Sequence, residues 1–266
     1  MSEKNRRFIF YSLVVLVILV SSISVLWLPK DIATKEPAEA PPLIAFFPVF
    51  AYVVLILLPV IYKRQEGSSF VWGHRFLKGT LLGFILITMI FLIELAAGLI
   101  HIEDLTPDIQ SVLIAGIGLQ LVVAFGEELP FRGYILPDMQ KRYGPWRAVF
   151  FSSLFFSILH IPSILTLNSS ATNTIIMLVT ITIAEILLAI CYLYDGLLMS
   201  IGFHFAWNFF QYHVFSLRED FGGILKITSD SQLLTGGTLG PEAGLLGMVV
   251  VTLALIIVFL WLQTRQ

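Results

Sequence analysis

The amino-acid sequence predicts an all-α membrane protein, a polytopic bundle of about eight transmembrane helices that forms a single integral membrane domain over residues 1–266. Composition is the first observation behind this prediction. Hydrophobic residues make up 57% of the chain and charged residues 13%, and mean hydropathy is +0.89, whereas soluble domains average about 45–50% apolar and about 25% charged residues. The second observation is that the apolar residues form long runs without the alternation typical of barrel strands. A bilayer is therefore the solvent that this chain requires.

The same composition excludes several classes of protein. So little charge cannot cover the surface of a soluble enzyme of 266 residues, and a disordered chain would contain far fewer apolar residues. A nucleic-acid binder would need a basic face, whereas the net charge here is −2. We therefore expect the lipid bilayer, and no nucleic acid, among the partners. The single cysteine, Cys191, excludes an internal disulfide framework and a cysteine-rich metal site.

A helix that spans a bilayer needs about 20 mostly apolar residues, and eight segments meet or approach this length. They cover residues 8–28, 43–62, 76–100, 110–136, 146–161, 174–194, 197–215 and 243–262. The first run follows basic residues, as a signal peptide would. It is too long for one and has no small-residue cleavage site, so we expect a retained helix. The longest connection, at about 216–242, is rich in glycine and polar residues.

Lys and Arg residues orient the spans, because they concentrate in cytoplasmic loops. Alternating spans place eleven of the 16 basic residues on the side of the N-terminus and four on the other side, with Arg132 inside a span. An even number of spans then puts both termini in the cytoplasm.

Ionisable groups inside spans are costly and are functional candidates by default. The set is short, and the intramembrane amide of Asn208 joins it: Glu94, Glu127, Glu128, Arg132, His160, Glu185 and His204.

The spacing of Glu127, Glu128 and Arg132 suggests different roles for the two adjacent glutamates. Glu127 and Glu128 differ by about 100° around a helix, and Arg132 shares the face of Glu128 at a spacing of four residues. Pairing of Glu128 with Arg132 would neutralise both charges and leave Glu127 pointing elsewhere, free to act as a base. A purely structural network that staples the helix is equally compatible with this spacing.

Two histidines repeat the four-residue spacing, since His160 follows Phe156 and Asn208 follows His204 by four residues. His204 and Asn208 could donate hydrogen bonds to an oxyanion. Alternatively, Glu127, His160, His204 and Asn208 could hold a divalent metal such as zinc. At a rise of about 1.5 Å per residue, Glu127, His204 and Asn208 lie about 10–16 Å from the cytoplasmic ends of their spans, and His160 about 21 Å.

These motifs carry a family resemblance. Residues 127–132 read E-E-L-P-F-R, residues 156–160 read F-S-I-L-H and residues 204–208 read H-F-A-W-N. The ordered set resembles the E-E-x-x-x-R, F-x-x-x-H and H-x-x-x-N motifs of the CPBP family of intramembrane proteases. That family includes the CAAX prenyl endopeptidases and the Abi proteins linked to bacteriocin self-immunity. The resemblance covers a protease-like core at about 110–215, and residues 236–242 more weakly resemble a loop before the last helix of many prokaryotic members.

The resemblance implies an endopeptidase whose site lies inside the helical bundle, with a peptide or membrane protein as its substrate. Glu127 would activate a water molecule and His160 would help to position it. His204 and Asn208 would stabilise the oxyanion. We therefore expect the protein in the plasma membrane of a prokaryote.

Glu128 and Arg132 would orient this site, with Glu128 as a second acid. Members of the family are often called metalloproteases. The chain has no H-E-x-x-H motif, however, and asparagine is an uncommon zinc ligand. We favour a glutamate-dependent mechanism without a cofactor, with a metallo-endopeptidase as the alternative.

Two functions of other classes stay open at this point. A non-catalytic membrane scaffold or immunity protein would reuse the same bundle. A proton-coupled transporter would use the buried acids, although the lack of internal repeats disfavours it. Glu94 and Glu185 lie outside the motifs, and we expect structural roles for them, such as pairing with Arg132.

Overall fold

A computed structural model of the chain describes residues 2–26, 42–167, 169–218 and 222–263. Three of the basic residues counted to orient the spans, Lys30, Lys35 and Arg265, lie outside these ranges, as does most of the connection between the first two predicted spans.

Helices occupy each of the eight predicted segments. In chain order they are α1 (Glu3–Leu26), α2 (Pro42–Gln65), α3 (Phe76–Ala96), α4 (Ile109–Pro130), α6 (Pro145–Leu159), α8 (Ala171–Asp195), α9 (Leu197–Asn208) and α11 (Leu245–Gln263). Shorter elements extend or connect them: the π-helices η2 (Phe131–Ile135) and η3 (Phe209–Val214), and α5 (Leu136–Tyr143), α7 (Ile161–Leu165) and α10 (Gln232–Thr235). The all-α class predicted from the sequence is confirmed.

Five helical segments of the described chain are long and apolar enough to cross a membrane: Glu3–Ser22, Phe76–Ala96, Ile109–Tyr143, Pro145–Leu165 and Ala171–Asp195. A shorter apolar helix covers Leu245–Leu260. The protein is therefore an integral, multi-pass membrane protein. The total of eight crossings stays a prediction, because α9 itself has only 12 residues before it widens into η3.

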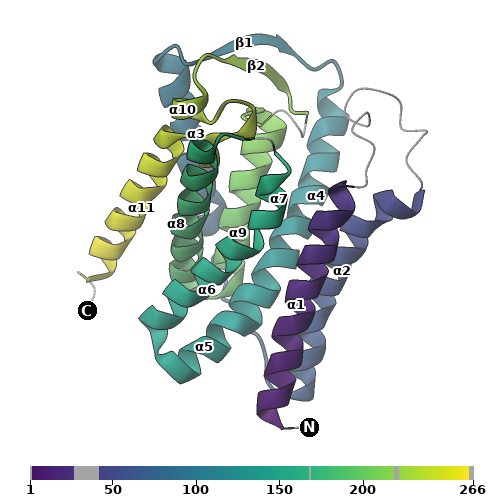
Figure 1. Cartoon of the computed structure of the whole chain (residues 1–266). Coiled ribbons are helices and arrows are strands. Elements are labelled where there is room, and N and C mark those ends of the chain that lie inside the picture. Colours follow the sequence, from purple (N-terminus) through teal and green to yellow (C-terminus); the bar gives the residue numbers. More distant parts are fainter. Residues whose placement is uncertain (1, 27–41, 168, 219–221, 264–266) are drawn as a thin grey trace.

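The sequence-based prediction did not include two strands, and it was wrong to extend the third span through residues 97–100. Helix α3 ends at Ala96, and β1 (Ile100–Leu105) pairs antiparallel with β2 (Leu225–Ser229) from the long glycine-rich connection. This small sheet lies at the end of the bundle opposite the start of α1 (Figure 1). Short, mostly exposed strands bury too little apolar surface to leave a clear hydrophobic pattern.

Local sequence explains where several helices begin. Asp108 and Ser170 cap α4 and α8 by accepting hydrogen bonds from backbone N–H groups of the first turn. Proline occupies the first turn of α6, where its missing N–H costs nothing. Gly196 adopts φ +87° between α8 and α9, a backbone conformation that turns the chain back into the bundle.

Helix α9 packs unusually close to α3. A Cβ atom at Gly79 would collide with the Met199 carbonyl, one at Gly83 would meet the Phe203 carbonyl, and one at Gly202 would collide with the Phe76 carbonyl. Small residues on both partners let helix backbones approach closely inside membranes. This contact fixes the position of α9, which carries the second predicted histidine motif.

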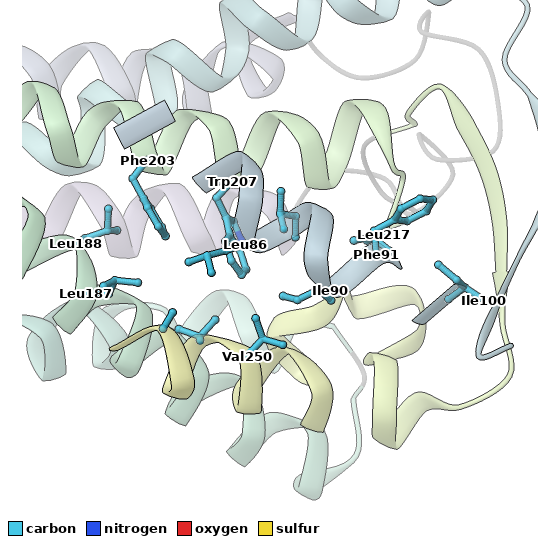
Figure 2. Packing of buried hydrophobic residues seen from close by; sticks show 13 residues of the cluster. Leu86, Ile90, Phe91, Ile100, Leu187, Leu188, Phe203, Trp207, Leu217 and Val250 are labelled. Atoms are coloured by element: carbon cyan, nitrogen blue, oxygen red, sulfur yellow. The ribbon is translucent and has the colours of Figure 1, made fainter. Parts of the chain in front are cut away.

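An apolar cluster surrounds the same contact. Figure 2 shows Leu86 and Ile90 of α3 near Trp207 of α9 and Val250 of α11, all buried. The cluster extends to Ile100 at the start of β1, so the outer sheet is anchored to the core. The polar residues of the three motifs are not members of this cluster.

Candidate active site

The first motif sits where α4 changes its geometry. Pro130 has no N–H to donate, and the following five residues form the π-helix η2, in which the Leu136 N–H bonds to the Phe131 carbonyl. Arg132 lies within η2, four residues after Glu128. Single π-turns inside α-helices are frequent at functional sites.

Arg132 connects two buried carboxylates. Its Nη1 atom lies 3.3 Å from Oε1 of Glu128, and its Nη2 atom lies 2.6 Å from Oε2 of Glu185 on α8 and donates to the Glu185 backbone carbonyl. The three side chains are at most 4% exposed. The predicted pairing of Glu128 with Arg132 is therefore confirmed, and so is pairing of Glu185 with Arg132.

Glu94 behaves differently from Glu185. It lies on α3, is 1% exposed, and both of its carboxylate oxygens lack a hydrogen-bond partner among the described residues. The suggestion that it pairs with Arg132 is wrong, since the ion pairs of Arg132 go to Glu128 and Glu185.

His204 joins the two halves of the acidic pair. Its Nδ1 atom lies 2.9 Å from Oε1 of Glu128, and its Nε2 atom lies 3.7 Å from Oε2 of Glu127. Because an ionised carboxylate only accepts, the Nδ1 atom of His204 carries a proton that it donates to Glu128. The ring therefore presents Nε2 toward the Glu127 side.

Glu127 is held from the opposite side by Tyr52 of α2, whose hydroxyl donates to Oε1 of Glu127 at 2.9 Å. The Tyr52 ring packs so closely on Gly126 that a Cβ atom there would collide with it. The Glu127 side chain is 18% exposed, whereas Glu128 is fully buried. The two adjacent glutamates thus differ as predicted: Glu128 is paired with an arginine and Glu127 is not.

His160 ends α6, and the end of the helix sets its orientation. The His160 N–H bonds to the Ser157 carbonyl, so the Phe156 carbonyl accepts from Nδ1 of the imidazole at 3.0 Å instead. The ring also stacks on Phe156, with centroids 4.4 Å apart. A backbone carbonyl only accepts, so Nδ1 carries the proton and Nε2 of a neutral ring keeps its lone pair.

Glu127 and His160 line one cavity of about 190 Å³. Its walls come from α1, α2, the end of α4, η2, α6 and α7, and Tyr52, Phe131 and Phe156 supply aromatic surface. The depth estimate from the sequence left His160 somewhat apart, but the short α6 and the turn into α7 bring it to the same cavity as Glu127.

Asn208 completes the third motif by position only. It is the last residue of α9, one turn beyond His204, and is partly buried. Within the described chain its amide makes no hydrogen bond, which leaves both amide atoms available to a bound substrate.

Three of the four residues considered as metal ligands, Glu127, His160 and His204, are Glu or His side chains. The described ranges contain no group of three or more His, Cys, Asp or Glu side chains arranged to hold a metal ion. The geometry thus gives no support to a ligand set of Glu127, His160, His204 and Asn208.

Two residues of the cluster were not predicted as part of the site. Tyr52 lies in a continuous apolar run of α2 and carries no spacing signal. Glu185 was recognised as a buried acid, yet its place beside Arg132 depends on the approach of α8 to η2, which no local pattern reveals.

The helical bundle and its buried carboxylate–histidine cluster define a class, a multi-pass membrane protein with a polar site enclosed by its helices. Residues 109–210 match a family model described as type II CAAX prenyl endopeptidase Rce1-like. The match covers less than half of the chain and supports a CPBP/CAAX protease assignment for this segment, which indicates a hydrolase. The matched segment runs from the start of α4 into η3 and contains all three motifs. No curated protein matches the chain.

Proposed function

We propose that the protein is an intramembrane endopeptidase that hydrolyses a peptide bond with water activated by Glu127. The observation that carries the proposal is the setting of the Glu127 carboxylate. It shares a cavity with His160, Tyr52 holds one of its oxygens, and His204 faces the other. This is the arrangement of a carboxylate prepared to accept a proton from water beside a polarised carbonyl group.

In the proposed reaction, Glu127 takes a proton from water as the water oxygen attacks the peptide carbonyl carbon. The carbonyl oxygen becomes an oxyanion, which His204 and Asn208 stabilise by donating hydrogen bonds. Glu127 then delivers its proton to the nitrogen of the leaving amine as the carbon–nitrogen bond breaks. The Nε2 lone pair of His160 accepts a hydrogen bond from the attacking water and orients it.

Glu128, Arg132 and Glu185 have a supporting role in this proposal. Three carboxylates, including Glu127, face one guanidinium and one imidazole within a few ångströms. Excess negative charge in a buried cluster is costly, so the cluster favours retaining a proton among its members. Glu128 would accordingly hold His204 in the protonation state that donates to an oxyanion.

We propose a mechanism without a metal, since the described residues offer no assembled ligand set. For the substrate we propose a peptide or membrane protein that reaches the cavity within the bilayer, with a prenylated C-terminal peptide as the first candidate. Bacteriocin-immunity proteolysis is a second candidate for the same chemistry. Both termini would face the cytoplasm of a prokaryotic cell.

The test uses purified full-length protein in proteoliposomes with an internally quenched peptide that ends in a farnesylated CAAX sequence. Glu127→Gln and His160→Ala should each lower cleavage at least about 100-fold while insertion and folding are retained. Glu94→Gln serves as the matched control, because it neutralises a buried glutamate outside the cavity and should leave cleavage unchanged. Substrate trapping with Glu127→Gln in cells, read by mass spectrometry, identifies natural substrates. Wild-type rates in a folded Glu127→Gln protein would overturn the proposal.

A further inference from the structure

One acidic residue on the outer loop reaches into the bundle. Glu242 lies in the 3₁₀ turn Pro241–Ala243, immediately before α11. Its Oε1 atom accepts a hydrogen bond from Nε1 of Trp207 at 3.0 Å, and its Oε2 atom accepts from Nε2 of Gln211 at 2.7 Å. A single carboxylate thus bridges two side chains that are four residues apart.

The two donors flank the third sequence motif. Trp207 directly precedes Asn208, and Gln211 follows Asn208 by three residues. Between them the chain changes from α9 to the π-helix η3, at the Asn208–Phe209 step. Anchoring one residue before the junction and one after it fixes the rotation of the helix at Asn208, and with it the direction of the Asn208 amide.

The loop that carries Glu242 is itself firmly held. Nδ2 of Asn173 on α8 donates to the carbonyls of Gln232 and Ala243, at 2.8 and 2.9 Å. Gly240 adopts φ +87°, and a Cβ atom there would approach Nε2 of Gln211 to 3.0 Å. The hydrogen bonds from Asn173 therefore fix the position of the loop, and of Glu242, relative to α8.

The other end of this connection is equally fixed. Trp207 is buried in the apolar cluster between α3 and α11, where Figure 2 shows it near Leu86. Its indole N–H, the one polar group of the side chain, needs an acceptor in these surroundings. Glu242 provides that acceptor. The hydrogen bonds of Glu242 to Trp207 and Gln211, called the tether below, therefore join the loop to the apolar core.

We propose that Glu242 is a positioning residue that fixes the junction between α9 and η3 and thereby aims the Asn208 amide at the oxyanion. This inference rests on the proposed peptidase function and deepens it. Glu242 acts through Trp207, Gln211 and Asn208, without contact to the reacting atoms.

The chemistry of the tether predicts an unequal response to two substitutions. Glu242→Ala removes both acceptors and should lower kcat about tenfold with KM changed by less than about twofold. Glu242→Gln should recover most of the wild-type kcat. Its amide oxygen still accepts from Trp207, and its amide nitrogen can donate to Oε1 of Gln211, an atom that has no hydrogen-bond partner among the described residues.

A double-mutant cycle with Asn208→Ala separates positioning from general structural support. Asn208→Ala should lower kcat about 100-fold, and adding Glu242→Ala should change kcat by less than about twofold further. Multiplicative losses, or a Glu242→Gln variant as impaired as Glu242→Ala, would overturn the proposal. Trp207→Phe keeps an aromatic side chain but replaces the indole by a smaller phenyl ring and deletes the N–H donor, and it should lower kcat about threefold even if Glu242→Ala does not fold.

Glu103→Ala is the matched control, because Glu103 is an exposed acid on β1 at the same end of the bundle. Its kcat should equal that of the wild type on the quenched farnesylated peptide. If the wild type and Glu103→Ala both cleave the peptide and Glu242→Ala has the same kcat, the positioning role of Glu242 is refuted while the proposed peptidase function stands. If the wild type shows no cleavage that depends on Glu127, the proposed peptidase function itself is refuted.

Discussion

The imidazole of His204 lies between two adjacent glutamates, with Nδ1 2.9 Å from Glu128 and Nε2 3.7 Å from Glu127. One carboxylate is fully buried and paired with Arg132, and the other faces a cavity. Glu128 thus orients the imidazole ring of His204, and the Nε2 atom of the ring faces Glu127. Neighbouring residues of identical type can differ in this way because a helix points them in directions about 100° apart.

Glu128→Gln should impair catalysis without changing the shape of the site. The amide oxygen can still accept from Nδ1 of His204, but the charge that pairs with Arg132 and favours a protonated ring is lost. We expect kcat to fall about 100-fold and the free energy of unfolding to fall by about 2 kcal/mol. Cleavage kinetics and thermal unfolding in detergent measure both quantities.

Glu66→Gln is the control for this variant, since Glu66 accepts a hydrogen bond from Tyr134 at 2.7 Å away from the cavity. Its kcat should remain that of the wild type. If Glu128→Gln retained kcat within about threefold, orientation of His204 by charge would be the wrong explanation.

Tyr52→Phe should lower kcat about tenfold, because it removes the hydroxyl that holds Oε1 of Glu127 and leaves the ring in place. Tyr62→Phe on the same helix is the matched control. Tyr62 is buried in an aromatic cluster, and its hydroxyl makes no hydrogen bond within the described ranges. Equal kinetics for the two variants would show that Tyr52 serves packing alone.

Glu185→Gln should destabilise the protein, whereas Glu94→Gln should not. Glu185 lies 2.6 Å from the guanidinium of Arg132, and neutralising it leaves that buried cation with Glu128 alone. We expect a loss of about 2 kcal/mol in unfolding free energy. Both oxygens of Glu94 lack partners in the described part of the chain, so its neutralisation removes an unpaired buried acid. Similar melting temperatures for the two variants would contradict this distinction.

Removal of divalent metal should leave cleavage within about twofold of its starting rate. The reason is the lack of an assembled group of three metal-binding side chains among the described residues. Dialysis against a chelator, followed by kinetics and elemental analysis of the protein, measures the effect. Loss of activity with recovery on added zinc would favour the metallo-endopeptidase alternative instead.

The long apolar helices could be predicted from the sequence, because a membrane helix is recognised by the length and composition of its apolar run. The sequence also predicted the pairing of Glu128 with Arg132, since a spacing of four residues within one helix determines a shared face. Contacts between helices were harder to predict. Tyr52 reaches Glu127 across 75 residues, and Glu185 reaches Arg132 across 53, so neither contact is encoded in a local pattern.

The outer strands escaped prediction for a different reason. Residues 100–105 pair with residues 225–229 across a long interval, and most of their side chains are exposed. Backbone pairing between two such distant and exposed segments has no local sequence signal. The contacts of loop residue Glu242 have no local sequence signal either, because its donors Trp207 and Gln211 lie on α9 and η3.

The π-turn at 131–135 has a consequence for how this chain tolerates changes in length. Upstream of it, Glu128 accepts from His204 on α9; downstream, Tyr134 donates to Glu66 and Asp138 accepts from Tyr11. Deleting one residue from the turn would rotate everything after it by about 100° relative to everything before it. After such a deletion, no single rotation of the helix could form both the buried ion pairs and the contact with α1. The number of residues in this segment is therefore constrained as tightly as the identity of Arg132 within it.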